Sequence, residues 1–566
     1  MARRDDAGGL TFELVPDDGD DLPATGTAPA RVEAAGTEPV EVPPSLAARA
    51  LRVLRSHPRT TVASAVALAL VAAGGVVAVV LPQRQRDAAL TASPGAVVSL
   101  SEPIHSVWTS DAGHVPASPG PWPVAAFRDV VVVSERASPS STVLRGIDLG
   151  AGTVRWSVTL DGADAVCGTG VTDQPQERLS VQPVRSLVCV TGTGAGSRVV
   201  VVDDAGHTAR RTPAGLDAGT RLRPGPDGSV LRVQPDGTVP DGVRVVPDST
   251  DGWVLSESFQ APTVTVSAED ARTGSVRWSQ TVEGGRLDQV RDWWSCSTWG
   301  DDGTPKLDPG AVAWTVSESV VAVQVCGAEA AFTASGAPVL EAVAGTDGFG
   351  QSMAVESLPG GRVRVPSGAA TDGIEDPIGP ARVVDQSGAV VADLEGGVLD
   401  PRSTDGSTPG VLLTHDGTTV SAVGRDGATL WTVPETTMIE SLVAQARGVA
   451  VVARPVGGAK TGELAALDLA TGKTLWTASL GKLGSTGSTV GFVHGAWTDG
   501  RSVVVSTPGD QVAGRQVWAA LDLRTGDVLW KLSSGEAESV IGPTATCLAV
   551  AGRLLCVEGS RLVRIS

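Results

Sequence analysis

One stretch near the C-terminus decides the fold: Ala466-Leu-Asp468-Leu-Ala-Thr471-Gly472-Lys-Thr-Leu-Trp476. A short apolar run leads to an Asp, a Thr-Gly pair follows, and a second short run ends in Trp. An Asp carboxylate accepts hydrogen bonds from backbone N–H groups in a turn, and Gly allows the positive φ that a tight hairpin turn requires. The stretch therefore predicts two strands joined by a tight turn, with the Trp ring buried against neighbouring structure.

The same frame recurs four more times, three times without a gap and once with one residue fewer. Its characteristic residues are Asp148, Gly152 and Trp156; Asp270, Gly274 and Trp278; Trp431 in the shorter copy; and Asp522, Gly526 and Trp530. Degraded copies without Trp lie at residues 203–206, 334–336 and 385–388. Successive Trp residues are 122, 153, 45 and 54 positions apart. These spacings fit a repeated unit of about 45–60 residues, which is the size of a four-stranded β-propeller blade.

The region after residue 98 reads as β-structure throughout. It contains short apolar runs bounded by Gly, Asp, Ser or Pro and no sustained helical periodicity. Clear examples are residues 130–133, 199–202, 320–325, 449–452 and 503–505. At the C-terminus, residues 544–565 supply three strands without a fourth, and residues 104–109 near the start form a lone outer strand. Pairing these would close a ring and leave no exposed sheet edge.

The frame A-x-D-x-x-T-G-x-x-x-W resembles the repeat of PQQ-like (quinoprotein-type) β-propellers. That group includes bacterial outer-membrane assembly lipoproteins and quinoprotein dehydrogenases, so the resemblance is specific to a fold and not to an activity. It covers roughly residues 100–566 and is strongest in the last third. Counting every predicted hairpin gives nine units. Because the family favours eight and one middle unit looks incomplete, we expect an all-β, eight-bladed propeller within a range of seven to nine.

The N-terminal region predicts a membrane anchor. Residues 60–81 read TTVASAVALALVAAGGVVAVVL, without a charge, and at about 1.5 Å per residue they cross a hydrocarbon core of about 30 Å. A buried helix or a signal peptide is the alternative, but the following Leu-Pro-Gln-Arg is a poor cleavage site. Four Arg residues precede the span and two follow it, which favours an N-terminus inside the cell. We therefore expect a signal anchor that places the propeller outside the cytoplasmic membrane.

These features divide the chain into four parts. Residues 1–59 form a cytoplasmic acidic tail with a juxtamembrane Arg cluster, disordered over its first 44 residues because it lacks apolar side chains to bury. Residues 60–81 form the transmembrane helix, residues 82–98 a linker, and residues 99–566 the propeller. The formal net charge of −19 and the absence of a basic stripe argue against a nucleic-acid partner.

The six Cys residues fall into three local pairs: Cys167 and Cys189, Cys296 and Cys326, and Cys547 and Cys556. In the last pair, a two-residue turn at Ala551-Gly552 sets the two cysteines opposite each other, where Cα atoms of a non-hydrogen-bonded pair approach to about 4.5 Å. Six buried free thiols are the alternative. Local pairing of an even number behind a membrane span favours three disulfides and an oxidising compartment, which agrees with the inside N-terminus.

Motifs of catalysis are missing from the sequence. There is no nucleophile elbow, Walker loop or H-E-x-x-H, and the six His residues are scattered. The quinoprotein resemblance implies an adjacent Cys-Cys pair and an Asn ligand to Ca²⁺, yet no two Cys are adjacent and the chain has no Asn. The Trp-rich insert at residues 292–299 could form a stacking floor, although a loop held by a disulfide is the simpler interpretation. We therefore assign no catalytic, cofactor-binding or metal-binding residue.

Three functions remain open at this point. The first is a non-enzymatic binding or scaffold protein that engages a protein, a peptide or a cell-envelope ligand, as the resemblance to the assembly lipoproteins implies. The second is a dehydrogenase of alcohols or sugars that depends on PQQ and Ca²⁺. The third is a sensor that signals through the cytoplasmic tail. The first agrees best with the missing motifs, and no cofactor is expected for it.

Overall fold

The structure is a computed structural model, and it describes residues 83–566 except 112–122, 139, 163–164, 169–179, 249–251, 288–294, 301, 345–354, 367–379, 436–438, 440, 456–461, 486–492, 511–514 and 543–544. Residues 80–566 form one compact unit. No helix within the described ranges has the length and apolar character needed to cross a bilayer. The predicted tail and transmembrane helix, residues 1–81, lie outside the described residues.

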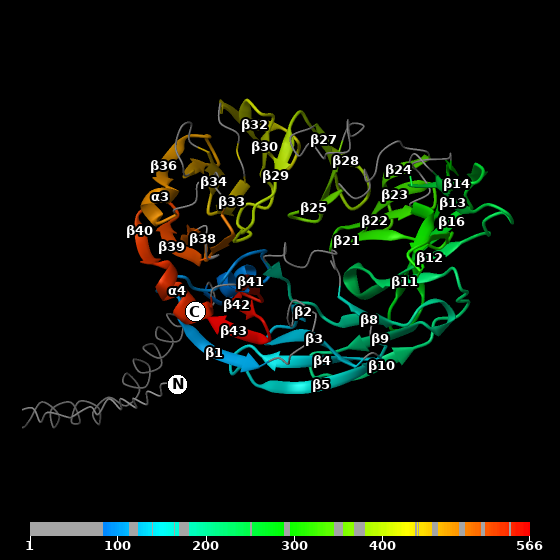
Figure 1. The fold of residues 1–566 in the computed structure, drawn as a ribbon. Helices are drawn as coiled ribbons and strands as arrows, with labels where there is room; N and C mark the ends of the chain where they lie inside the picture. Colours follow the sequence, from blue (N-terminus) through cyan, green and yellow to red (C-terminus); the bar gives the residue numbers. More distant parts are fainter. Residues whose placement is uncertain are drawn as a thin grey trace, which may run out of the picture. The chain divides into compact units, whose positions relative to one another are not determined.

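Nine sheets are arranged around a common centre, so the described unit is a nine-bladed β-propeller (Figure 1). Eight sheets have four antiparallel strands, and the ninth has four antiparallel strands and a short parallel fifth. The first four blades are blade 1, with β2 (Pro123–Ala126), β3 (Val130–Ser138), β4 (Ser141–Asp148) and β5 (Val154–Asp161); blade 2, with β6 (Val166–Cys167), β8 (Leu187–Thr191), β9 (Arg198–Val202) and β10 (Thr208–Arg211); blade 3, with β11 (Arg221–Pro224), β12 (Ser229–Pro235), β16 (Val264–Asp270) and β17 (Val276–Val282); and blade 4, with β21 (Ala313–Val316), β22 (Val320–Val325), β23 (Ala328–Thr333) and β24 (Pro338–Ala344).

The next four blades have the same order. They are blade 5, with β25 (Glu356–Leu358), β26 (Arg362–Pro366), β27 (Ala381–Val384) and β28 (Val390–Leu394); blade 6, with β29 (Gly397–Leu399), β30 (Leu412–His415), β31 (Thr419–Val423) and β32 (Thr429–Pro434); blade 7, with β33 (Ser441–Ala446), β34 (Val449–Arg454), β35 (Glu463–Asp468) and β36 (Thr474–Ser479); and blade 8, with β37 (Gly495–Thr498), β38 (Ser502–Asp510), β39 (Arg515–Asp522) and β40 (Val528–Leu532).

Blade 9 joins the two ends of the ring. It consists of β41 (Thr546–Val550), β42 (Arg553–Glu558), β43 (Arg561–Ile565) and β1 (Ser106–Asp111). β1 pairs antiparallel with β43, and Ser110 stands opposite Leu562. The predicted closure by the lone N-terminal strand is therefore confirmed, and the ring has no open sheet edge at its seam.

The expectation of eight blades was wrong. The middle of the chain, which looked one unit short of full blades, contains two complete sheets, β21–β24 and β25–β28. Their third-to-fourth-strand turns lack the Trp of the repeat, and this made the units hard to recognise, but each sheet still pairs four strands. Counting every hairpin, degraded or not, gives the correct number.

Short strands and helices lie outside the four main strands of each blade. The sequence between blades 3 and 4, together with a loop within blade 3, adds two hairpins and one pair of short strands that are distant in the chain. A further strand of two residues and two helices complete the described set. They are β13 (Val245–Asp248) with β14 (Gly252–Leu255), β15 (Phe259–Gln260) with β18 (Arg286–Leu287), β19 (Ser297–Trp299) with β20 (Pro305–Leu307), β7 (Ser180–Val181), α3 (Leu480–Leu483) and α4 (Ser534–Ile541).

The core lies between neighbouring blades. Both faces of a blade's central strands pack on the next sheet, which is why these strands read as continuous apolar runs and not as alternating ones. In β3, for example, residues 130–133 are at most 1% exposed. One cluster combines Val451 and Leu464 of blade 7 with Val503 and Leu521 of blade 8. The predicted β-rich runs at residues 130–133, 199–202, 320–325, 449–452 and 503–505 all lie in such strands.

Candidate functional site

The repeat motif forms the turn between the third and fourth strands of a blade, as predicted. In blade 1, Asp148 Oδ1 accepts hydrogen bonds from the N–H groups of Gly150 (2.6 Å) and Ala151 (2.7 Å), and Gly152 has φ +72°. The same turn recurs at Asp270 with Gly274, Asp468 with Gly472 and Asp522 with Gly526. In blade 3, the hydrogen bond from Arg277 and those from the turn lower the pKa of Asp270 to about 2.

The motif Trp contacts the next blade. Six Trp side chains each donate their Nε1–H to a backbone carbonyl, at 2.8–3.1 Å. The pairs are Trp108 with Leu149, Trp156 with Asp204, Trp278 with Ala334, Trp431 with Leu469, Trp476 with Leu523 and Trp530 with Leu100. In five of the pairs the acceptor lies in the turn of the next blade. In the sixth, Leu100 precedes β1, where blade 9 has chain ends in place of a turn.

The turn Gly allows this interblade tryptophan contact because it has no side chain. A Cβ atom at Gly526 would lie 2.6 Å from the Trp476 ring, and one at Gly152 would lie 2.6 Å from the Trp108 ring. The motif residues therefore act in pairs across a blade boundary. The sequence predicted a buried ring but not its partner, because the frame shows each motif only within its own blade.

All six cysteines are paired as the sequence predicts. The disulfides are Cys167–Cys189, Cys296–Cys326 and Cys547–Cys556. Cys547 and Cys556 face each other on β41 and β42, with their Cα atoms 4.0 Å apart. Cys296–Cys326 ties the β19–β20 hairpin to the end of β22, so the described part of the Trp-rich insert is a loop held by a disulfide. Trp293 and Trp294 of that insert lie outside the described residues.

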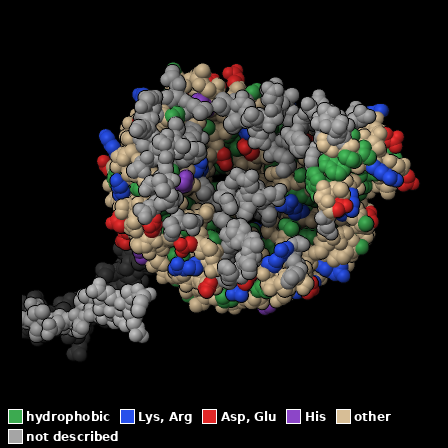
Figure 2. Space-filling view, viewed as in Figure 1, with side chains coloured by type: hydrophobic (Ala, Val, Ile, Leu, Met, Phe, Trp, Pro, Cys, Tyr) green, Lys and Arg blue, Asp and Glu red, His purple; other side chains and the backbone are tan. Residues whose placement is uncertain are grey.

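A cavity of about 970 Å³ opens at the centre of the ring. Its wall comes from the turns that join the first and second strands of blades 3, 4 and 5, from the connection between β29 and β30, and from segments on either side of them. The described lining residues are Ala92–Pro94, Gly168, Gln182–Val188, Pro224, Gly225, Asp227, Gly228, Ser317–Ser319, Ser357–Gly361, Asp400, Pro401, Thr404, Gly406, Thr408, Pro409 and Gln445. Figure 2 shows the hollow. Lys and Arg side chains are scattered over the visible face and do not form a continuous basic patch.

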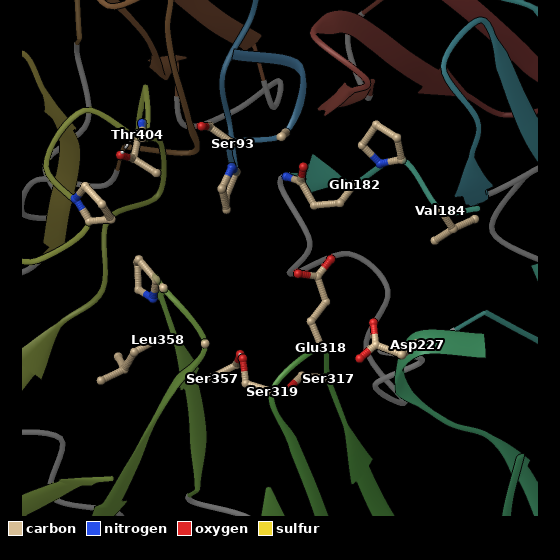
Figure 3. Close-up of a pocket in the computed structure, with 18 of the residues that line it drawn as sticks. Ser93, Gln182, Val184, Asp227, Ser317, Glu318, Ser319, Ser357, Leu358 and Thr404 are labelled. Carbon is tan, nitrogen blue, oxygen red and sulfur yellow. Dashed lines mark hydrogen bonds between the residues drawn. The ribbon is translucent and has the colours of Figure 1, made fainter. Parts of the chain in front are cut away.

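Three carboxylates from three blades line this cavity: Asp227, Glu318 and Asp400. In Figure 3 the Glu318 side chain points into the open space, with Asp227 beside it and Ser93 and Gln182 on the opposite side. Burial, and then the charge of Asp227, raise the pKa of Glu318. None of the three carboxylates forms an ion pair among the described residues, and Arg185 is the one cation in the described lining.

Asp400 has an unusual environment. The residue is exposed and lines the cavity, although much of the space around it is occupied by protein. Burial, and then the charge of Glu356, raise the pKa of Asp400 to about 7.

The N-terminal segment of the described chain forms part of the cavity wall. Residues 83–91 are helical, and Leu90 is 1% exposed. The Pro94 carbonyl accepts a hydrogen bond from Thr404 N–H (2.9 Å), and Val97 N–H donates to the Thr498 carbonyl (2.9 Å). The sequence assigns residues 82–98 to a linker, whereas from residue 83 the structure places this segment against blades 6, 8 and 9.

The cavity does not fit the quinone cofactor of the quinoproteins. PQQ is a flat tricarboxylate, so its site needs cations and a stacking surface. The described lining has three carboxylates, one Arg and no aromatic ring. No group of three or more His, Cys, Asp and Glu side chains among the described residues is arranged to hold a metal ion. The described lining residues therefore do not supply a set of groups that fits PQQ or its Ca²⁺.

The sequence did not predict the cavity residues. Asp227, Glu318 and Asp400 each follow directly, or within three residues, on a first strand: β11, β21 and β29. A charged residue at that position is a usable signal, because first strands line the channel. This signal is usable only after the first strands have been located. The sequence does not locate them, because these short strands have the weakest apolar pattern in the chain.

Fold and repeat together define the class of structure: a β-propeller whose repeat is similar to that of the PQQ-like propellers. Residues 416–565 match the family model described as outer membrane protein assembly factor BamB. Among curated proteins, none matches the chain.

The chain is also similar to solved structures, all of them remote in sequence. BamB from Moraxella catarrhalis is 13% identical, with 82% of this chain and 100% of that chain covered and a TM-score of 0.35. Quinohemoprotein alcohol dehydrogenase from Comamonas testosteroni is 12% identical, with 85% and 81% covered and a TM-score of 0.34. Hsv2p from Kluyveromyces lactis is 10% identical, with 73% and 99% covered and a TM-score of 0.28.

Proposed function

We propose that this protein is a non-enzymatic binding or scaffold protein whose propeller engages a protein or peptide partner at its central cavity. The carrying observation is the match of residues 416–565 to the model of an outer membrane assembly factor. The cavity agrees with this proposal, because its described lining offers polar and backbone groups without a nucleophile–base pair or a metal cluster. Loops on a rigid ring are a common basis for such recognition.

Membrane anchoring is part of the proposal and rests on the sequence. The uncharged run at residues 60–81 would hold the chain in the cytoplasmic membrane, N-terminus inside, and the three disulfides suit a propeller in an oxidising compartment. Deleting residues 60–81 should move the protein from the membrane fraction to the soluble fraction. Protease added to intact spheroplasts should degrade the propeller, and protection of the propeller would contradict the orientation.

The binding role is tested by crosslinking in cells. A photo-crosslinking amino acid is placed at position 185, in the cavity wall, and as a control at position 393, on the outer strand β28. We expect discrete protein adducts from position 185 and none of the same adducts from position 393. Equal patterns from both positions, or no adduct from the cavity, would contradict the proposal.

The dehydrogenase alternative has its own measurement. A ligand present at 100 times its Kd stabilises the folded state by about 2.7 kcal/mol. We expect no rise in the Tm of the full-length chain on addition of PQQ and Ca²⁺. A dose-dependent rise would support the quinoprotein function instead.

A further inference from the structure

The charge of the cavity wall indicates which class of ligand it binds. Its described lining holds three carboxylates, Asp227, Glu318 and Asp400, against the single cation Arg185. The remainder of the chain reinforces this sign, since the formal net charge is −19. A recess of one sign with protein walls concentrates ligands of the opposite charge.

The carboxylates are spread around the wall and not gathered at a point. Asp227 and Glu318 are close enough for the charge of one to raise the pKa of the other, whereas Asp400 comes from blade 6 and is influenced by Glu356. No metal-binding group exists among the described residues. This spacing suits a ligand with several separated positive charges better than it suits a single ion.

The wall also offers hydrogen-bonding atoms that lack a partner. Gln182 Oε1 and Ser317 Oγ are inaccessible to bulk water and have no hydrogen bond among the described residues. Both residues line the cavity, and Figure 3 places Gln182 across the open space from Glu318. Water does not reach these two oxygens in the empty cavity, so a polar ligand satisfies them only if the Gln182 and Ser317 side chains turn toward it.

Glycine and proline make up much of the remaining wall, at positions such as Gly225, Gly360, Gly361 and Pro409. Few bulky side chains stand between a ligand and the backbone groups of the turns. The volume of about 970 Å³ is at the upper end of the range of about 300–1,000 Å³ for ligand pockets, which is more than a single amine needs.

We propose that the cavity binds an extended peptide segment that carries Lys or Arg side chains, with Glu318 and Asp227 receiving one cationic group and Asp400 another. The ligand's backbone and polar groups contact the exposed turns, and they reach Gln182 and Ser317 once those side chains turn toward the cavity. This inference rests on the proposed binding function and names the chemistry of its partner. An acidic or neutral segment lacks the charges that this wall recognises.

Calorimetric titration of the full-length chain in an uncharged detergent tests the proposal, with the peptide acetyl-Lys-Ala-Lys-Ala-Lys-amide as probe. The cavity variant combines Asp227→Asn, Glu318→Gln and Asp400→Asn. Asn is chosen at position 227 because that residue has φ +52°, which Asn tolerates. The matched control combines Asp241→Asn, Glu257→Gln and Asp393→Asn, which changes the net charge equally at positions outside the cavity lining.

We expect the cavity variant to bind the Lys peptide at least about tenfold more weakly than the wild type, and the control variant less than about twofold more weakly, at about 0.05 M salt. The peptide acetyl-Glu-Ala-Glu-Ala-Glu-amide should not bind. Equal losses in both variants, or no binding of the Lys peptide by the wild type, would overturn the proposal. Equal Tm values of the three proteins establish that the variants are folded.

Failure of this inference is distinguishable from failure of the proposed function. If the cavity variant binds the Lys peptide as the wild type does, yet position 185 still forms its adducts in cells, the charge preference is wrong and the binding role stands. If position 185 forms no adducts, the binding role fails whatever the peptide does.

Discussion

The two sides of the ring are joined in different ways. From blade 6 through blade 9 and on to blade 2, every blade boundary has an interblade tryptophan contact, such as that of Trp476 with the turn at Gly526. On the other side, Trp278 makes this contact between blades 3 and 4, but the three remaining boundaries lack it. Arg211 replaces the Trp between blades 2 and 3. Thr333 bonds to Gln386 between blades 4 and 5, and Ala392 stands beside Gly427 between blades 5 and 6. The cavity carboxylates come from this second side and its border, in blades 3, 4 and 6. Asp227 and Asp400 lie in blades that keep the motif Trp, whereas Glu318 lies in blade 4, which has lost it. The side of the ring that is joined less regularly is therefore also the side that supplies the cavity carboxylates.

The largest effect should come from removing a tryptophan contact on the regular side. Trp476 is 8% exposed, so Trp476→Ala leaves a cavity and an unpaired carbonyl and should lower the free energy of unfolding by about 3–5 kcal/mol. Leu340→Ala, at the matching position of blade 4, should cost about 1–2 kcal/mol. Denaturant midpoints of the full-length chain measure both. Equal losses would contradict the comparison, and Leu475→Ala, at a position 42% exposed, is the surface control.

Two glycines with the same φ distinguish the effect of overlap with a Trp ring from the effect of backbone strain. Gly526 has φ +74° and Gly448 has φ +75°, but a Cβ at Gly526 meets the Trp476 ring at 2.6 Å whereas one at Gly448 meets nothing within 4 Å. Gly448→Ala should therefore cost about 1–2 kcal/mol from strain alone, and Gly526→Ala about 2–4 kcal/mol because of the added overlap. Thermal unfolding of both variants checks this. The same loss in each would mean that the turn needs Gly only for its φ.

The Cys547–Cys556 disulfide in blade 9 tests how much this blade contributes to the stability of the whole ring. Replacing Cys547 and Cys556 by Ala frees a loop closed by nine residues of sequence separation, which should lower stability by about 2–3 kcal/mol in the chain-entropy account. Because this pair lies in the blade that joins the two chain ends, the whole ring should unfold earlier in denaturant. Replacing Cys296 and Cys326 instead should expose mainly the inserted hairpin to hydrogen exchange. A global loss from the second pair and none from the first would reverse this assignment.

The smallest effect is the pH dependence of a repeat turn. The pKa of Asp270 is lowered to about 2 in the folded chain, against about 3.9 when unfolded, so its charged form stabilises the fold above about pH 4. This stabilisation, about 1–2 kcal/mol after allowance for solvent around the partly exposed side chain, should be lost as the pH falls from 4 to 2. Tm measured over that range should fall less steeply in Asp270→Asn than in the wild type. Parallel curves would mean that the turn does not depend on the charge.

The sequence predicted what local chemistry determines. The Asp and Gly of a turn, the closing strand at residues 104–109 and the cross-strand pairing of Cys547 with Cys556 each depend on a few neighbouring residues, and the structure has all of them. The number of blades depended on sheets whose turns have lost their Trp, where the local signal is weak. The cavity depended on bringing Asp227 and Glu318 together across 91 positions, which no short pattern encodes.

The segment before β1 gives the molecule a mechanical property. Arg86 donates to the Asp499 carbonyl (2.7 Å), Val98 N–H to the Gly552 carbonyl (3.0 Å), and Ser93 and Pro94 lie between these contacts and the cavity. A pulling force applied at residue 83 therefore acts first on a few hydrogen bonds at the cavity wall, while the strand pairs of the ring stay unloaded. The same short stretch of chain, at Ser93 and Pro94, therefore both lines the cavity and takes the load first.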